Sequence, residues 1–229
     1  MHLVPSAQGT VAAWRVGDGP AVLLVHGWED DNSLWAPLID ALVARGRSVV
    51  VFDLPGHGRS QGEWGLGAQA ADGILAVCAS LGPVDAAVSH SMSAGGVVIA
   101  VTEGLELQRC VFIAPPLRGG GRGERWRRYA ERLGVSDVIA EAAQRLYEER
   151  VGPARAAFDF RAALEQLDSE LLFVHSRDDE RNPYADSAVV VPRCRQAQLI
   201  TVSGLTHRRT ARDPEVVAHV AAFVTPGAS

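Results

Sequence analysis

The sequence has few cysteines, and they are not arranged for cross-linking. Its 229 residues contain three, Cys78, Cys110 and Cys194, an odd number with wide spacing. Cys78 and Cys110 each lie inside an apolar segment. Disulfide frameworks are typical of proteins from oxidising compartments that contain an even number of cysteines. The sequence therefore favours buried thiols in a reducing compartment.

Long hydrophobic runs are also absent. The longest apolar stretches span a handful of residues, far below the ~20 that a bilayer-spanning helix needs. The chain begins MHLVP, without the basic start and long apolar run of a secretory signal. We therefore expect a soluble, cytoplasmic protein that does not bind a membrane.

Charge of one sign is not concentrated anywhere in the chain. The net charge is −5, and no block of five or six like charges occurs, so nothing indicates a nucleic-acid partner. No His, Cys, Asp and Glu residues have the spacing of a metal site. The segments Gly17-Asp-Gly19 and Gly56-His-Gly58 are too short for phosphate-binding loops. We expect no metal and no nucleotide cofactor, and the oligomeric state stays open.

What the sequence does contain is an ordinary globular composition with strand and helix patterns in alternation. Apolar residues make up 47% and charged residues 21%, and this length predicts one domain over residues 1–229. The alternation favours an α/β fold, a mostly parallel sheet with helices on both faces. Strands are predicted over Thr10–Val16, Ala21–Val25, Ser48–Phe52, Val84–Val88, Arg109–Ala114, Leu171–Val174 and Gln198–Val202. Helices are predicted over Ser33–Arg45, Leu66–Leu81, Met92–Gly104, Phe158–Leu167 and from Pro214, with Asp213 as N-cap.

The alternation stops over residues 115–157, where two helical patterns follow each other. Their apolar faces predict a helical lid inserted between strands of the single domain. The first half of this insertion is rich in arginine, at Arg118, Arg122, Arg125, Arg127, Arg128 and Arg132. Two interpretations of these arginines stay open: a solvated helix face, or attraction of an anionic substrate.

Four segments in order along the chain resemble the α/β-hydrolase fold. Ser89–Ser93 (SHSMS), at the end of a predicted strand, looks like the nucleophile elbow. His26-Gly27-Trp28 matches the loop after the third strand, and Asp53–Ser60 (DLPGHGRS) looks like the loop after the fourth. Ser203–His207 (SGLTH) is similar to the turn that carries the catalytic histidine. The resemblance covers about Val22 to Phe223 and places the predicted lid where this family has its cap.

The resemblance makes Ser91 the nucleophile. A serine hydroxyl attacks well only when a neighbouring base takes its proton, and the elbow lifts it above the sheet toward such a base. Ser89 and Ser93 stand where the family motif usually has glycine, because backbones pass closely there. We interpret this departure as tolerated, since serine is small. The alternatives are a broken elbow, Ser89 or Ser93 as the nucleophile, and an ordinary polar turn.

The resemblance also implies the two partners of the nucleophile. His207 would be the general base and later the general acid, the alternative being a surface loop histidine. Residues 175–183 (HSRDDERNP) resemble the family's loop after the seventh strand, which selects Asp179 as the acid. Asp179 would fix the imidazole tautomer and stabilise the imidazolium. Asp178 is the runner-up, and an acid elsewhere in the chain is the remaining alternative.

The family's oxyanion hole consists of two backbone N–H groups. By position these belong to Trp28 and Met92. The Trp28 side chain either walls an acyl pocket or simply packs. His26 and His57 lie in the motif loops, and we interpret them as structural.

These residues together imply a serine hydrolase. The simplest form is a carboxylesterase that cleaves a small acyl substrate through an acyl-enzyme, without a cofactor. The preference for esters is fold-level analogy. Two alternatives stay open. The same triad could hydrolyse a carbon–carbon bond, a lactone or a thioester, or the scaffold could serve a catalytically silent binding protein.

Overall fold

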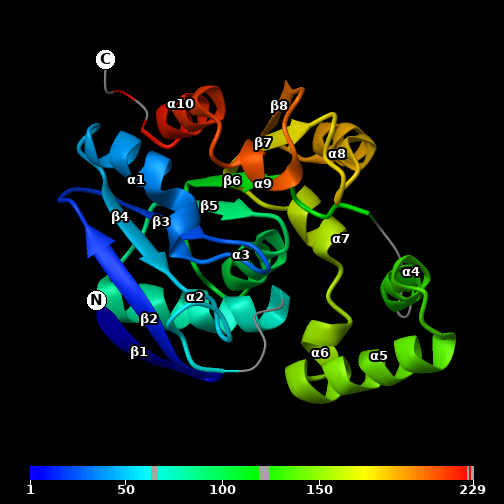
Figure 1. Cartoon of the computed structure of the whole chain (residues 1–229). Coiled ribbons are helices and arrows are strands. Elements are labelled where there is room, and N and C mark those ends of the chain that lie inside the picture. Colours follow the sequence, from blue (N-terminus) through cyan, green and yellow to red (C-terminus); the bar gives the residue numbers. More distant parts are fainter. Residues whose placement is uncertain (63–66, 119–123, 226, 228–229) are drawn as a thin grey trace.

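An eight-stranded sheet organises the chain in this computed structural model, which describes residues 1–62, 67–118, 124–225 and 227 (Figure 1). The strand order is β1-β2-β4-β3-β5-β6-β7-β8. The strands are β1 (His2–Ser6), β2 (Gly9–Val16), β3 (Ala21–Val25), β4 (Ser48–Phe52), β5 (Ala86–His90), β6 (Arg109–Ile113), β7 (Glu170–Ser176) and β8 (Ala197–Val202). β1 with β2 and β2 with β4 are antiparallel pairs, and all others are parallel. The predicted mostly parallel α/β sheet is confirmed.

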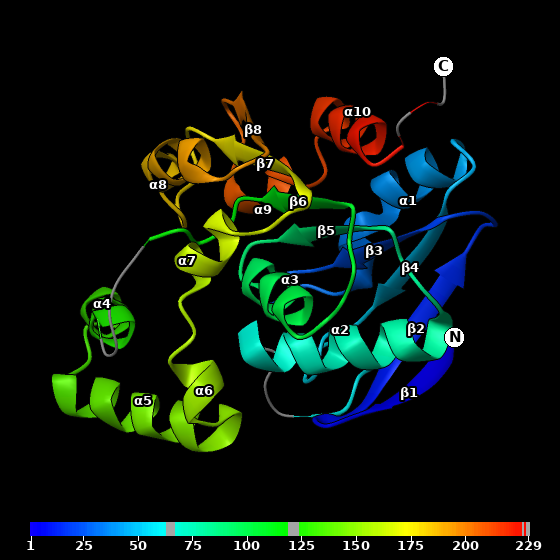
Figure 2. The same ribbon diagram turned by 180° about the vertical axis from the view of Figure 1, so that it is seen from behind.

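Helices cover both faces of this sheet, as predicted. The described helices are α1 (Ala36–Val43), α2 (Gly67–Leu81), α3 (Ser93–Thr102), α4 (Glu124–Leu133), α5 (Asp137–Val151), α6 (Pro153–Ala156), α7 (Phe160–Glu165), α8 (Tyr184–Val190), α9 (His207–Thr210) and α10 (Pro214–Phe223), with 3-10 turns at Asn32–Trp35 and Val191–Arg193. None of them is both long and apolar enough to cross a bilayer. The view from behind shows α2 and α3 on one side of the sheet (Figure 2).

The core has two halves, one on each face of the sheet. In β3, Leu23 and Val25 pack with α2 and α3, whereas Val22 and Leu24 pack with α1 and α10. This division follows from the strand period of two, which sends successive side chains to opposite faces. A strand buried on both faces therefore reads as a continuous apolar run, which is why β3 has the boundaries that its AVLLV sequence predicts.

Glycine lets α2 and α3 approach each other closely. A Cβ atom on Gly96 would lie 2.7 Å from the Cβ atom of Ala70 and 3.0 Å from the carbonyl oxygen of Gly67. Gly73 likewise faces the ring of Phe52, which would be 3.0 Å from an added Cβ atom. Close packing thus accounts for Gly96 in α3, which lies against α2, and for Gly73 in α2, which lies against β4, although glycine lowers helix propensity.

Several boundaries differ from the sequence-based predictions. The predicted helix over Ser33–Arg45 divides into a 3-10 turn, capped by Asp31, and α1. The strand predicted over Val84–Val88 begins two residues later. β1 and α8 were not predicted at all. The first residue of the helix predicted from Leu66 lies outside the described residues, as do Gly119 to Gly123.

The segment predicted to be a lid contains α4, α5 and α6. The rings of Trp126 in α4 and Tyr147 in α5 lie 5.7 Å apart, and the ribbon places both helices beside the sheet, beyond α7 (Figures 1 and 2). Several apolar side chains here are exposed, among them Leu133 and Val138. That these helices close over a site stays a prediction.

The arginines of this segment are only partly described. Arg118 Nε lies 3.5 Å from Asp186 Oδ2. Arg122 lies outside the described residues, as do the side chains of Arg125 and Arg132. Both interpretations of the cluster, a solvated face and attraction of an anion, therefore stay open.

Arg155 fixes the end of this segment to the body of the molecule. Its guanidinium binds both carboxylate oxygens of Glu103, at 2.8 and 2.6 Å, and Asp72 Oδ1 at 2.6 Å. Arg155 Nη1 also donates to the Ala68 carbonyl oxygen at 3.2 Å. Because Asp72 and Ala68 lie in α2 and Glu103 follows α3, one side chain joins α6 to both helices. The hydrogen bonds to Glu103, and to a lesser extent those to Asp72, raise the pKa of Arg155 above its usual range.

We predict that Arg155→Met lowers the free energy of unfolding by about 2 kcal/mol, because it removes several charge-assisted hydrogen bonds from a partly buried cluster. Urea unfolding measures this change. Arg145→Met is the matched control, since Arg145 pairs with Glu141 at an exposed position and its loss should cost under about 0.5 kcal/mol. Equal stabilities for the two variants would contradict the anchoring role.

Candidate active site

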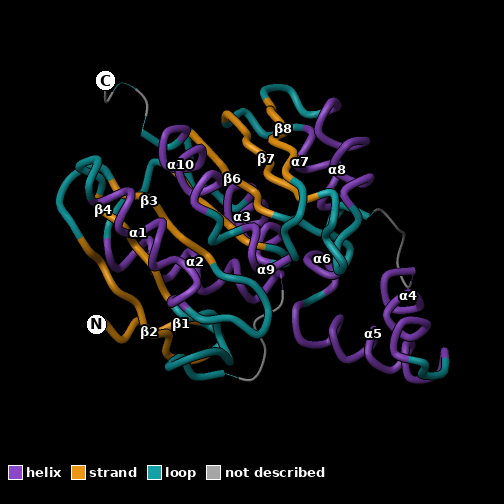
Figure 3. The backbone as a smooth tube through the Cα atoms, turned by 45° about the horizontal axis from the view of Figure 1, so that its top comes forward, coloured by secondary structure: helices purple, strands orange, loops and turns teal. Residues whose placement is uncertain are grey.

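Four loops meet at the carboxyl edge of the parallel strands, the usual position of a site in this type of sheet. Ser91 follows β5 directly, and Trp28 comes three residues after the end of β3. Asp179 follows β7, and His207 follows β8 as the first residue of α9. Figure 1 shows α9 beside the ends of β6 and β7, and Figure 3 shows the same sheet from a second angle.

The backbone at Ser91 has the sharp turn predicted from the sequence. Ser91 has φ +56°, one of three positive values at described residues other than glycine. Such a conformation is costly for a serine and is held by its surroundings. The N–H of Ser91 donates to the Ile113 carbonyl oxygen at 2.8 Å, and α3 begins two residues later. The turn leaves Ser91 half-buried.

The flanking serines are buried and their hydroxyls are used by the backbone. Ser93 Oγ lies 2.9 Å from the carbonyl oxygens of both Val25 and His90, and Ser89 Oγ donates to the Val111 carbonyl oxygen at 3.3 Å. Ser91 Oγ, in contrast, has no hydrogen bond to a described residue, and it is not among the fully buried atoms without a partner. Of the three hydroxyls, that of Ser91 is the one without a hydrogen bond to a described residue.

Gly27 brings the loop after β3 directly against the elbow. A Cβ atom on Gly27 would lie 3.0 Å from His90 Nδ1 and 3.2 Å from Ser91 Cβ, so this close approach needs glycine. Trp28 is the next residue, and its side chain is 41% exposed and lies edge-on to His57, with ring centroids 5.4 Å apart. The oxyanion-hole assignment of the Trp28 and Met92 N–H groups stays a prediction.

Asp179 and His207 are in direct contact. His207 Nδ1 lies 2.7 Å from Asp179 Oδ2. Asp179 Oδ1 accepts from the N–H groups of Arg181 and Asn182, both at 2.8 Å. The neighbouring Asp178 instead accepts from the Gly204 N–H at 2.6 Å. The imidazole therefore contacts Asp179, while Asp178 binds the loop that carries His207.

The Asp179 side chain is fully buried and nevertheless strongly acidic. Burial opposes its ionisation, but hydrogen bonds from His175, His207 and the Asn182 N–H outweigh burial and hold the pKa of Asp179 below its usual range. His175 Nε2 lies 3.3 Å from Asp179 Oδ2, and its Nδ1 lies 2.6 Å from Ser187 Oγ. The carboxylate is thus charged throughout the neutral range and gives His207 an acceptor at Nδ1.

No hydrogen bond joins Ser91 to His207, although both belong to the described part of the chain. The two residues share a neighbour, because the ring of His90 lies 4.7 Å from the ring of His207. His207 Nε2 has no partner among the described residues and is not fully enclosed. The contact between the serine oxygen and this nitrogen stays a prediction.

His26 has a structural position. Its Nε2 accepts from the Leu54 N–H at 2.9 Å, and its Nδ1 lies 2.8 Å from the Gly27 carbonyl oxygen. Burial lowers the pKa of His26 to about 4, so the ring stays neutral and joins the loops after β3 and β4. His57 lies next to it, with ring centroids 5.4 Å apart.

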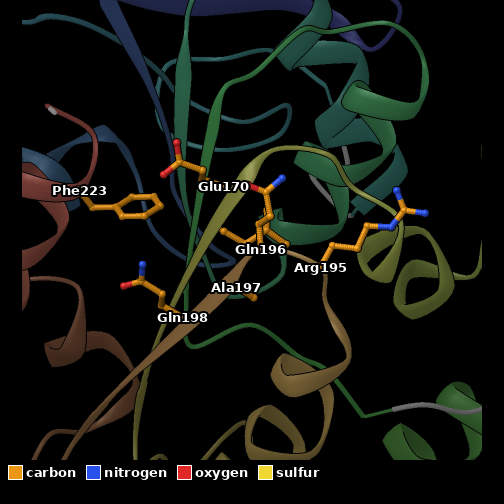
Figure 4. Close-up of a pocket in the computed structure, with 7 residues that line it drawn as sticks. Glu170, Arg195, Gln196, Ala197, Gln198 and Phe223 are labelled. Atoms are coloured by element: carbon orange, nitrogen blue, oxygen red, sulfur yellow. The ribbon is translucent and has the colours of Figure 1, made fainter.

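The other chemical groups of the described chain lie elsewhere. All three cysteines are free and buried, and burial raises the pKa values of Cys78 and Cys110 to about 12. Among described residues, no group of three or more His, Cys, Asp or Glu side chains could hold a metal ion. A pocket of about 310 Å³ lies between the first residues of β7 and β8 and Phe223 (Figure 4). This is the end of β7 opposite to the one that leads to Asp179.

Sequence comparison relates the chain to hydrolases. The profile of the alpha/beta hydrolase family matches residues 22–224. A segment of 48 residues is 50% identical to the pimeloyl-[acyl-carrier protein] methyl ester esterase of Vibrio atlanticus, and it spans 20% of this chain but only 18% of that esterase. An epoxide hydrolase of Caballeronia sordidicola is 22% identical over 77% of this chain and 46% of its own length.

Comparison with solved structures shows the same fold over nearly the whole chain. The esterase EaEST of Exiguobacterium antarcticum has a TM-score of 0.77 at 15% identity, covering 98% of this chain and 99% of its own. An esterase of Thermogutta terrifontis has a TM-score of 0.73 at 21% identity, covering 96% and 95%. A bromoperoxidase of Bacillus anthracis has a TM-score of 0.71 at 18% identity, covering 96% and 98%. At these identities the likeness concerns the fold alone.

We predict that His26 makes the folded state less stable in acid. The unfolded imidazole takes up a proton below about pH 6.5, whereas the folded one resists protonation until about pH 4. The stability is therefore fully present above pH ~6.5 and falls by about 2 kcal/mol between pH 7 and pH 5.

Urea unfolding of the wild type and of His26→Gln at these two pH values measures the effect. Glutamine offers Leu54 an acceptor that does not titrate, so this variant should lose less stability on acidification. The other histidines are common to both proteins, and their contributions cancel in the comparison. The same pH dependence in both proteins would contradict the prediction.

Proposed function

This chain belongs to the alpha/beta hydrolase family, and on that premise we propose that it is a serine hydrolase with Ser91 as nucleophile, His207 as general base and Asp179 as the acid that orients His207. The 2.7 Å contact between His207 Nδ1 and Asp179 Oδ2 carries this proposal. It leaves Nε2 as the basic atom of a neutral imidazole, on the side of the ring away from the carboxylate.

The proposed reaction has two steps. Ser91 Oγ attacks the acyl carbon while His207 Nε2 takes the hydroxyl proton, and the leaving alcohol then receives that proton as its bond to the acyl group breaks. In the second step a water molecule gives its proton to Nε2 and attacks the acyl-enzyme. The acid leaves, and Ser91 recovers its hydrogen. Asp179 remains ionised throughout and balances the positive charge on the imidazolium.

The oxyanion that forms in both steps needs donors that are already in place. We assign these to the backbone N–H groups of Trp28 and Met92. Two observations support the assignment: Gly27 places its loop against Ser91, and Met92 precedes the first turn of α3. The positive end of the helix dipole adds to the stabilisation of the negative charge.

We propose a small carboxylic ester as the substrate. The supporting observations are that two similar solved structures are esterases and that a short segment matches a methyl ester esterase. The other reactions considered from the sequence, on carbon–carbon bonds, lactones or thioesters, would use the same residues. A cytoplasmic enzyme that acts without a cofactor is part of the same proposal.

The first test is covalent labelling of the nucleophile. A fluorophosphonate probe should modify Ser91, and Ser91→Ala should abolish the labelling detected by mass spectrometry. Ser89→Ala and Ser93→Ala are matched controls that keep it, because their hydroxyls bond to the backbone. Labelling at Ser89 or Ser93 would contradict the proposal. No labelling of the folded wild type would also contradict it, and would favour a binding protein.

The second test is the pH dependence of ester hydrolysis. With the p-nitrophenyl acyl ester of the best chain length, kcat/KM should fall on acidification, by up to about tenfold per pH unit, because the proposed base must be a neutral imidazole. The ionisation of Asp179 adds no further pH dependence to kcat/KM in this range, because the pKa of Asp179 lies below its usual range. His207→Ala should lower kcat by at least ~10³. A flat rate from pH 5 to 9 contradicts a histidine base, and hydrolysis of a diketone but of no ester contradicts the substrate class.

A further inference from the structure

Two side chains bind the main chain of His207, in addition to the contact that Asp179 makes with its ring. The N–H of His207 is one of the donors that the start of a helix leaves without a backbone partner, and Glu180 Oε2 accepts from it at 3.0 Å. The carbonyl oxygen of His207 lies 3.2 Å from His90 Nε2. Both polar groups of the His207 backbone are thus satisfied by side chains from other elements.

The carbonyl group is available because α9 is only four residues long. In a longer helix the N–H of Ala211 would bond to it, but this N–H bonds to the Arg209 carbonyl oxygen instead. A carbonyl oxygen only accepts, so His90 is the donor and its Nε2 carries the hydrogen. The hydrogen bond therefore selects one tautomer of the neutral His90 ring.

His90 is a buried donor whose other ring nitrogen, Nδ1, has no hydrogen-bond partner among the described residues. It is 1% exposed, and burial, opposed by Asp30, lowers its pKa and keeps the ring neutral. Asp30 Oδ2 lies 3.7 Å from His90 Nδ1, and Asp30 Oδ1 lies 2.5 Å from the guanidinium of Arg208. Because His90 also directly precedes Ser91, one residue of the elbow contacts the backbone of His207.

We propose that His90 and Glu180 are positioning residues, which set the backbone of His207 and thereby aim its Nε2 at Ser91. This inference rests on the proposed function. Neither side chain needs to touch the substrate. Their effect comes from geometry, since a displacement of about 1 Å in a reacting group can lower a rate by up to ~10².

Two matched pairs of variants test the proposal. In His90→Gln the amide N–H falls near the position of Nε2 and can still reach the His207 carbonyl oxygen, whereas in His90→Asn it does not reach. Glu180→Gln keeps an acceptor for the His207 N–H, and Glu180→Met removes it at an exposed position. The measurements are kcat and KM for the best p-nitrophenyl ester, the rate of phosphonate labelling, and the melting temperature.

We expect His90→Asn and Glu180→Met each to lower kcat and the labelling rate by about tenfold with KM unchanged, and both Gln variants to stay within about threefold of the wild type. A purely structural role would lower the melting temperature and leave the kcat of the folded protein unchanged. If either His90→Asn or Glu180→Met folds and keeps the wild-type kcat, the proposal is overturned. If His90→Asn does not fold, the Glu180 pair decides.

These measurements distinguish a failure of the proposed function from a failure of the positioning roles alone. A wild type that neither hydrolyses an ester nor reacts with the probe overturns the serine hydrolase and the positioning roles with it. A wild type that does both, with positioning variants that are equally active, overturns only the positioning roles.

Discussion

The need to satisfy one buried carboxylate determines the geometry of the site. The side chain of Asp179 is shielded from solvent, and a buried charge is tolerated only when donors surround it. The loop after β7 turns its N–H groups at Arg181 and Asn182 toward Oδ1, and two histidines approach Oδ2. Once these contacts form, Nδ1 of His207 is hydrogen-bonded to Asp179, and only Nε2 can act as a base.

Close approach of backbones is the second requirement, and it explains the residues around the elbow. Gly27 has no room for a side chain because His90 and Ser91 lie against it. Ser93 stands at a position where glycine is usual, and it fits because its hydroxyl lies within hydrogen-bond distance of two carbonyl oxygens. Serine at position 93 therefore adds a hydroxyl donor to the elbow, shared between these two oxygens, while the positive φ of Ser91 is kept.

Sequence patterns predicted those elements whose environment is uniform. β3 and β4 are buried on both faces, so their apolar runs define both ends, and α10 begins at the Asp213-Pro214 signal. β1 was missed because it is an edge strand with one fully buried residue and a proline. α8 was missed because it is short and has only two buried residues.

The sequence by itself determined the α/β fold, the positions of the motif loops and the identity of the candidate residues, since local patterns carry all three. Only the tertiary structure decided which carboxylate reaches His207, because Asp178 and Asp179 are adjacent and their directions depend on how the loop folds. It also decided that His90 and Glu180, which share no local motif with His207, contact the backbone of that residue. Contacts between side chains so distant in the sequence exist only once the sheet has brought the strand ends together.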